Sequence, residues 1–246
     1  MTVEDIAYVE LYTKDKVRAV RHLVSALGFT RVADCVEVDR SSVLLRQGAV
    51  QLVVTSGRGT WRFLSDHGEG VADIALNCRS VEAVQRAALV AGASVRRSAH
   101  GNPVVAGPAV FSHTLLPASP DGGLALPAGR RWAATPGAPA HPTGQVHGFD
   151  HLAIRCPADR LASYAAFCEG ALGLVPSSPA ERETGGSTVL SGGSGRASLV
   201  LSAAAWSEPG VHRIVFRSAP SDLSTPLEGK EYGDPWSYLF ERHALV

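Results

Sequence analysis

The stretch "DIAYVELYTKDKVRAVRHLVSALGFTRV", residues 5–32, is repeated in outline far along the chain, and this repeat is the clearest indication of the fold. Its pattern predicts a strand, then a helix, then a "LGF" corner that leads into another strand. Residues 148–175, "GFDHLAIRCPADRLASYAAFCEGALGLV", follow the same order and have His151 where the first copy has Tyr8. The sequence therefore predicts two halves built on one plan.

Each half also holds a second strand that begins with Gly-Val. Residues 70–78 read "GVADIALNC" and residues 210–218 read "GVHRIVFRS", and both continue with the period-two alternation of a strand. When these two stretches are aligned, Arg213 stands at the position of Asp73. The chain thus contains four modules that begin with a strand, two in each half.

Helical periodicity is clear in residues 80–93 and 158–173, where apolar residues recur every three or four positions and a glycine lies at the end. The corresponding part of the fourth module, residues 218–235, contains too many prolines and glycines for a full helix. We expect that helix to be shortened or lost.

A composition change marks the boundary between the halves. Residues 117–144 are rich in Pro, Gly and Ala, which suits an ordered linker better than a core element. We therefore predict an N-terminal domain at 1–116, with a structural role, and a C-terminal domain at 145–246, which carries the site.

The composition favours small-molecule chemistry. Of the 246 residues, 45% are hydrophobic, and the 23 basic and 23 acidic residues cancel, so nothing points to nucleic acid or an anionic membrane as a partner. The four cysteines lie far apart among apolar neighbours, which predicts reduced core thiols. We expect a soluble, cytoplasmic protein, and the sequence leaves open whether it forms a homodimer.

The order of modules resembles the vicinal oxygen chelate superfamily. Three stretches, "SSVLLRQGAVQLVVTSG", "SDHGEGVADIALNCRSVEAVQRAALVAGA" and "FDHLAIRC", resemble 4-hydroxyphenylpyruvate dioxygenase and 4-hydroxymandelate synthase in particular. The resemblance implies an α+β fold of two tandem domains, in which paired βαβββ modules curl into half-open barrels with a site on the concave face. It also implies a non-haem Fe(II) enzyme whose 2-oxo acid substrate chelates an iron held by two histidines and one carboxylate.

The implied iron ligands match this sequence only in part. His151 stands at the place of the family's first histidine, and Glu241 in "SYLFERHALV" stands at the place of the carboxylate. Arg213 occupies the place of the second histidine, with His212 one residue before it. The resemblance also leads us to expect a site without the closing helix of the family, because the sequence ends at Val246.

Strand alternation predicts whether Arg213 or His212 lies on the concave face. It puts Arg213 on the concave face and turns His212 toward the core, unless a bulge near Pro209-Gly210 re-aims the histidine. We therefore predict that His151, Glu241 and Arg213 are catalytic, and that His151, Glu241 and His212 bind a metal only with such a bulge. The predicted substrate-binding residues of this face are Arg155, Arg217, Val215 and Leu239.

Three functions remain open at this point. The first is Fe(II)-dependent oxygenation of an aromatic 2-oxo acid or a related small carboxylate, such as an intermediate of specialised metabolism. The second is a metal-independent cyclase, isomerase or dehydratase in which Arg155, Arg213 and Arg217 bind an anion and Glu241 acts as a base. The third is a protein that binds or sequesters a small molecule, with Trp206 and Trp236 as candidate walls.

The first half lacks the implied ligands even in outline, because Tyr8 and Asp73 stand at the places of His151 and Arg213. We therefore expect the working site in the second half.

Overall fold

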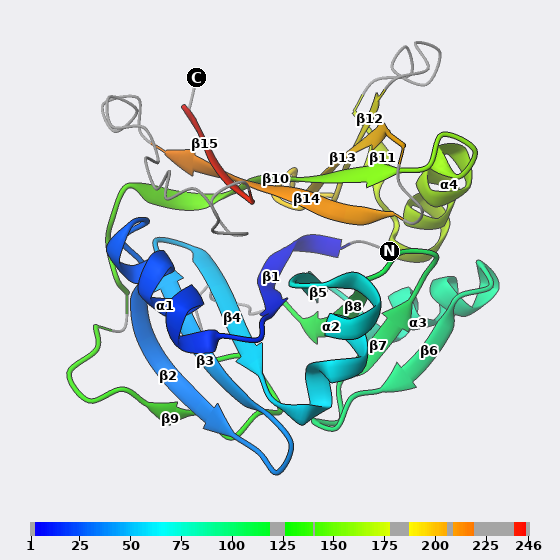
Figure 1. Ribbon diagram of the computed structural model, residues 1–246. Helices are drawn as coiled ribbons and strands as arrows, with labels where there is room; N and C mark the ends of the chain where they lie inside the picture. The colour runs from blue at the N-terminus through cyan, green and yellow to red at the C-terminus, as the bar shows by residue number, and fades with distance from the viewer. Residues whose placement is uncertain are drawn as a thin grey trace.

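The computed structural model describes residues 3–118, 126–139, 141–177, 187–205, 209–218 and 239–244, and for residues 241–244 it describes the backbone alone. Within these ranges the protein is an α+β structure with two mixed β-sheets and a few short helices (Figure 1). The predicted fold class is therefore confirmed.

The first sheet has nine strands among the described residues, in the order β6-β7-β8-β5-β1-β4-β3-β2-β9. It curls around the lower part of the molecule in Figure 1 as a half-open barrel. Its strands are β1 (Val3–Tyr12), β2 (Thr30–Val36), β3 (Ser41–Gln47), β4 (Val50–Ser56), β5 (Gly70–Cys78), β6 (Ser94–Arg97), β7 (Pro103–Ala106), β8 (Ser112–Pro117) and β9 (Ala133–Ala134).

The second sheet has six strands in the part of the chain that is described, in the order β11-β12-β13-β10-β14-β15. It lies across the first sheet in Figure 1. Its strands are β10 (Val146–Cys156), β11 (Val175–Pro176), β12 (Ser187–Ser191), β13 (Ser198–Ala203), β14 (Gly210–Ser218) and β15 (Phe240–Ala244).

The helices connect the strands of the predicted modules. They are α1 (Lys16–Ser25), the 3₁₀ turn η1 (Arg58–Thr60), α2 (Trp61–His67), α3 (Val81–Val90) and α4 (Leu161–Leu172). The two helices expected from periodicity are α3 and α4, and α4 ends at Gly173, whose φ of 69° is the left-handed conformation that glycine adopts without strain. Three modules read βαβββ, whereas the middle of the fourth, including the helix expected to be shortened, lies outside the described residues.

The central strands of the two halves pair in the same way. β1 pairs with β5, and β10 with β14, both antiparallel. Tyr8 is opposite Ala75 in the first pair, and His151 is opposite Val215 in the second. Asp73 and Arg213 then occupy equivalent positions, two residues before these partners. The internal repeat predicted from the sequence is confirmed.

The repeat extends to irregularities in the pairing. Each central pair shifts register three times, and each shift leaves one strand with an extra residue, a β-bulge. Ala7 and Asp150 are the equivalent extra residues on the first strands, and Ala72 and His212 are those on the second strands. A bulge re-aims the side chains beside it, so these shifts decide which residues reach the concave faces.

The two halves share one hydrophobic core. Phe216 of β14 is 1% exposed, and its ring centre lies 5.8 Å from that of Phe29 in the first half. On its other sides the Phe216 ring meets Phe149 at 6.0 Å and stacks on Phe240 at 5.8 Å. The second sheet is therefore fixed to the first through buried aromatic contacts.

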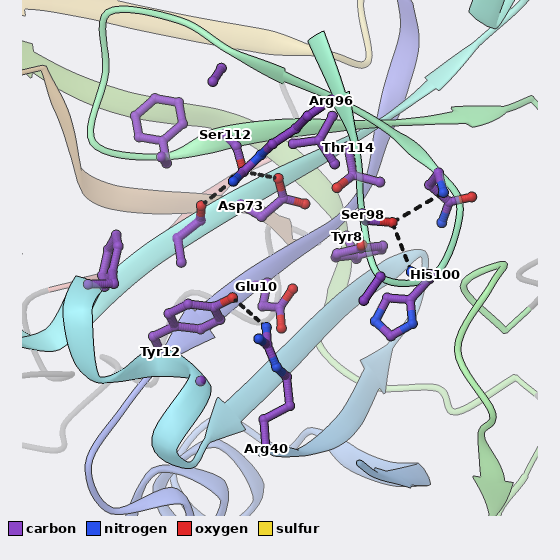
Figure 2. Close-up of a pocket in the computed structure, with 18 of the residues that line it drawn as sticks. Tyr8, Glu10, Tyr12, Arg40, Asp73, Arg96, Ser98, His100, Ser112 and Thr114 are labelled. Carbon is purple, nitrogen blue, oxygen red and sulfur yellow. Dashed lines mark hydrogen bonds between the residues drawn. The ribbon is translucent and has the colours of Figure 1, made fainter. Parts of the chain in front are cut away.

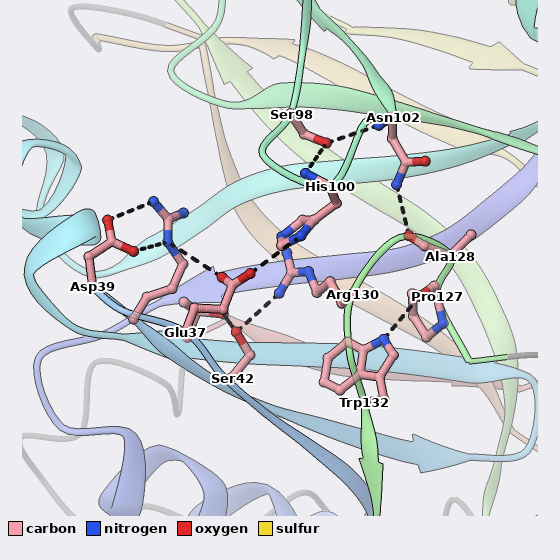
Figure 3. Close-up of polar contacts among 12 residues, drawn as sticks. Glu37, Asp39, Ser42, Ser98, His100, Asn102, Pro127, Ala128, Arg130 and Trp132 are labelled. Atoms are coloured by element: carbon pink, nitrogen blue, oxygen red, sulfur yellow. Dashed lines mark hydrogen bonds and ion pairs between the residues drawn. The ribbon is translucent and has the colours of Figure 1, made fainter.

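The segment predicted as a linker also contacts the first sheet. Its two-residue strand β9 pairs with β2, and the indole Nε1 of Trp132 donates a hydrogen bond of 2.9 Å to the Pro127 carbonyl (Figure 3). The domain boundaries at 116 and 145 stay a prediction. All four cysteines are buried thiols, as expected. Within the described residues, no helix combines the length and apolar character that a membrane crossing requires.

We expect Phe216→Ala to lower the free energy of unfolding by about 3–5 kcal/mol, because it leaves a cavity in the core shared by both halves. Urea unfolding followed by circular dichroism measures the change. Val38→Ala is the control, since Val38 is fully exposed, and we expect it to leave the midpoint unchanged. A loss below about 1 kcal/mol for Phe216→Ala would show that the two sheets do not depend on this contact.

Candidate functional site

The site predicted from the sequence lies on the face of the second sheet that points away from the shared core. Leu152 and Ile214 are opposite each other, fully buried and part of the core. The flanking pairs, His151 with Val215 and Ala153 with Arg213, therefore lie on the other face. Arg213 is exposed there, and His151 is half-buried.

Asp150 contacts His151 although the two are neighbours in a strand. In a regular strand adjacent side chains point to opposite faces, but Asp150 is the extra residue of a bulge. Its carboxylate Oδ2 lies 2.8 Å from Nδ1 of His151. A proton on Nδ1 that is shared with this carboxylate leaves Nε2 as the ring's lone-pair nitrogen, the arrangement of a general base or a metal ligand.

The other predicted residues surround this pair. Arg155 is exposed and lies on the same face of β10 as His151, and Arg217 follows Val215 on the same face of β14. Val215 itself is 1% exposed. Leu239 is buried and belongs to the shared hydrophobic core. The face therefore combines one histidine–aspartate pair with three arginines.

A bulge is required to turn His212 toward the concave face, and the structure has one at this residue. The shift between the pairs Ala153–Arg213 and Ile154–Val211 leaves His212 as the extra residue of β14. Its counterpart in the first half, Ala72, borders the cavity described next. Arg213 comes directly after this bulge and is opposite Ala153, two pairs along the ladder from His151.

The first sheet encloses a cavity of about 450 Å³ on its concave side (Figure 2). The strands β1, β5 and β8, together with the β6–β7 turn and Arg130, supply most of its polar wall. Figure 2 shows Tyr8, Glu10 and Tyr12 along one strand, with Asp73, Ser112 and Thr114 facing them. Strand alternation explains the first set, because residues two apart share a face.

A buried ion pair closes one side of this cavity. Arg130 binds Glu10, and their side chains are 8% and 4% exposed. Arg130 also donates a 3.0 Å hydrogen bond to the Ser42 hydroxyl (Figure 3). The Thr55 hydroxyl donates a 2.6 Å bond to Glu10. The guanidinium lies 6.0 Å from the ring centre of Tyr8. These contacts provide the partners that a buried charge pair requires.

Asp73 is the second carboxylate of the cavity and has no cation bound to it in any described contact. It is opposite Glu10 on the neighbouring strand and 6% exposed. Its Oδ1 accepts a 2.8 Å hydrogen bond from Ser112. The Thr114 hydroxyl lies close enough to lower the pKa of Asp73, but no described donor reaches Oδ2 with hydrogen-bond geometry. Burial, and secondly the charge of Glu10, raise the pKa of Asp73 to about 7.

Comparison with known proteins shows what this architecture is similar to. A family model described as "Hydroxyphenylpyruvate dioxygenase, HPPD, N-terminal" matches residues 1–113. The structure of a triple mutant of 4-hydroxymandelate synthase from Streptomyces coelicolor matches with a TM-score of 0.74 and 27% identity, over 89% of this chain and 72% of that one. The chain has the fold of these proteins, a vicinal oxygen chelate fold. It is similar to hydroxyphenylpyruvate dioxygenase and 4-hydroxymandelate synthase.

A second solved structure supports the fold alone. It is a fusion protein of a xylose isomerase-like TIM barrel and 4-hydroxyphenylpyruvate dioxygenase, with a TM-score of 0.72 and 18% identity. The match covers 88% of this chain and 37% of the fusion protein. Two tandem half-barrels are thus shared with these vicinal oxygen chelate proteins.

In this protein, the described donors do not make up the iron site that the resemblance implies. Glu241 is opposite Val215, which in turn is opposite His151, so the three backbone positions form one row across β15, β14 and β10. The side chain of Glu241 lies outside what is described, as do Trp206 and Trp236. Among the described residues, no three His, Cys, Asp or Glu side chains are grouped to hold a metal.

Sequence reasoning missed the cavity of the first half and the contact of Asp150 with His151. The alternating "YVELY" of residues 8–12, with a glutamate between two tyrosines, is a signal for a polar concave face. Arg130 carried no such signal, because it comes from a segment whose composition resembles a linker.

We expect Asp73→Asn to raise Tm at pH 8 by roughly 5 °C and to change it little at pH 4. The folded chain holds more protons on Asp73 than the unfolded chain between about pH 4 and about pH 7. The wild type therefore loses stability as the pH rises through this window, and an amide does not titrate.

Differential scanning fluorimetry from pH 4 to 8 measures this difference. His113 is buried, and its pKa is lowered to about 4 by burial, so it contributes the opposite slope in both proteins and cancels when they are compared. Parallel Tm curves for the two proteins would contradict the prediction.

Proposed function

We propose that the protein is an enzyme of the hydroxyphenylpyruvate dioxygenase-like type that acts on a small carboxylate or 2-oxo acid at the concave face of the second sheet. The observation that carries this proposal is the 2.8 Å contact between Asp150 and His151, with Arg213 on the same face two pairs along the ladder. A base and a cation on one face of the sheet suit an acidic substrate.

His151 is the proposed proton acceptor. Asp150 orients the imidazole through Nδ1, so that Nε2 takes a proton from the carbon next to the substrate's carbonyl or carboxylate group. The electron pair of that C–H bond becomes the π bond between the two carbons, and the π pair of the carbonyl moves onto its oxygen, which forms an enolate. Return of a proton to the same carbon restores the carbonyl and exchanges the hydrogen. In a conjugated substrate, return to the far carbon gives an isomer, and neither outcome involves net oxidation.

Arg213 is the proposed anion binder. A guanidinium keeps its charge at any working pH and binds a carboxylate through two parallel hydrogen bonds. Arg155 and Arg217 add positive charge on the same face, and Val215, which is opposite His151, is buried there. Glu241, opposite Val215 in the backbone register, is proposed as a second carboxylate for proton transfer.

These residues do not favour iron chemistry. His151 with its aspartate partner suits a metal ligand, but Arg213 stands where the resemblance implies the second histidine. A guanidinium beside His151 repels a divalent cation and attracts an anion. We derive no step through iron, and the ancestral Fe(II) oxygenation, with His212 as the third ligand, is kept as an outcome of the metal test.

Deuterium exchange tests the proposed proton transfer without a known substrate. The full chain is incubated in D₂O with a panel of aliphatic and aromatic 2-oxo acids, and loss of the C3–H signals is followed by proton NMR. We expect His151→Ala to slow the exchange at least about 100-fold and Asp150→Asn about 10-fold, because both act on the same proton transfer.

His147→Ala is the matched control, since His147 is an exposed histidine of the same strand, and it should leave the exchange unchanged. An equal loss in this control, or exchange in no member of the panel at a rate above the buffer rate, would count against the enzyme. Saturable binding of a 2-oxo acid without exchange would instead support a binding protein.

Anaerobic titration with Fe(II) tests the metal. We expect no stoichiometric binding by the unmodified protein, whereas Arg213→His should raise the affinity at least about 10-fold, because it replaces a cation by a neutral imidazole donor. The readout is metal content after gel filtration. Stoichiometric iron in the unmodified protein that is lost in His212→Ala and kept in Arg213→Ala would establish the oxygenase reading.

A further inference from the structure

We propose that the cavity of the first sheet is a second binding site, for a neutral aromatic molecule that carries a hydroxyl group. This proposal goes beyond the function proposed above, because it uses the first sheet and none of the residues assigned to the reaction.

Asp73 supplies the acceptor that such a ligand would complete. The residue is 6% exposed and lines the cavity, and its Oδ2 makes no hydrogen bond within the described chain. Leaving a buried acceptor without a donor is costly, and native structures generally avoid it. A ligand hydroxyl that donates to Oδ2 removes this cost, and the same hydroxyl can accept a hydrogen bond when the carboxyl group is protonated.

The charges around the cavity disfavour a cation as the ligand. Its lining contains two acidic residues, Glu10 and Asp73, and four arginines, Arg40, Arg96, Arg97 and Arg130. Glu10 already binds Arg130. A ligand ammonium group would therefore meet net positive surroundings, whereas a neutral hydroxyl carries no such penalty.

Aromatic rings supply the apolar walls. Tyr8, Tyr12, Phe63 and Phe111 all line the cavity, and the rings of Tyr12 and Phe63 meet edge to face with centres 5.4 Å apart. Burial, followed by the charges of Asp73 and Glu10, raises the pKa of Tyr8, so its hydroxyl stays neutral. A volume of about 450 Å³ is in the range of small-molecule pockets.

The walls are held in place by contacts within the protein. The Nη1 atom of Arg40 donates a 3.4 Å hydrogen bond to the Tyr12 hydroxyl, and Asn102 donates a 2.8 Å bond to the Ala128 carbonyl, which ties the segment before Arg130 to the rim (Figure 3). A ligand therefore meets a preformed site and pays little for ordering it.

Benzyl alcohol is the probe for the test, with toluene and benzylamine as matched molecules that lack the hydroxyl or replace it by a cation. Binding to the full chain at pH 8 is measured by ligand-observed NMR titration. We expect saturable binding of benzyl alcohol in the millimolar range, and binding of toluene and benzylamine that is at least about five-fold weaker.

Two variants locate the probe. Asp73→Leu should weaken benzyl alcohol binding at least about ten-fold, because it removes the acceptor. Ala99→Trp should weaken it as well, since Ala99 is an exposed residue of the cavity lining and a large side chain there narrows the entrance without altering the core. Asp66→Leu is the control, because Asp66 is a partly exposed carboxylate of α2 outside the lining.

The experiment separates a failure of the cavity site from a failure of the function proposed for the second sheet. Binding that is lost in His151→Ala but unchanged in Asp73→Leu and Ala99→Trp would place the probe on the second sheet and overturn the inference. Equal affinity for benzyl alcohol and toluene would also overturn it, because the buried carboxylate would then play no part. Loss in the two cavity variants with no change in His151→Ala supports the site, whatever the outcome of the exchange assay.

Discussion

The bulged pairing of the central strands governs both concave faces of this protein. Each antiparallel pair shifts register at three equivalent points, which changes the side on which neighbouring side chains emerge. One such shift lets Asp150 reach His151, its neighbour in the same strand. A second shift, present in both pairs, makes Ala72 the extra residue of β5 and His212 the extra residue of β14. Ala72 lines the first cavity.

The same scaffold carries opposite charges at equivalent positions in its two halves. Asp73 and Arg213 occupy matching places, as do Tyr8 and His151. The first face holds a cavity lined by a buried carboxylate, and the second presents exposed arginines. Two faces of one architecture therefore suit different ligands, which agrees with the general finding that function resides in sites placed on a fold.

Buried charge is the feature of the first half that packing alone does not explain. A buried ion pair contributes little net stability after desolvation, yet Glu10 and Arg130 are kept together with two hydroxyl partners, Ser42 and Thr55. Asp73 beside them has an acceptor without a donor. Unfavourable buried polar groups of this kind are generally found at functional sites. The unfavourable free energy of the unpaired acceptor is therefore the physical basis for assigning a ligand to the cavity.

The sequence by itself determined the repeat, the fold class, the helices at 81–90 and 161–172, and the equivalence of Asp73 with Arg213. These follow from periodicity and the order of strand starts, which are local properties of the chain. Alternation, which is also local, predicts that Arg213 shares a face with His151. Alternation could not reveal the contact of Asp150 with His151, because a bulge breaks the rule on which the argument rests. Only the tertiary structure showed the contact of Arg130 with Glu10. The two residues are 120 positions apart, and local sequence patterns do not predict contacts between distant segments.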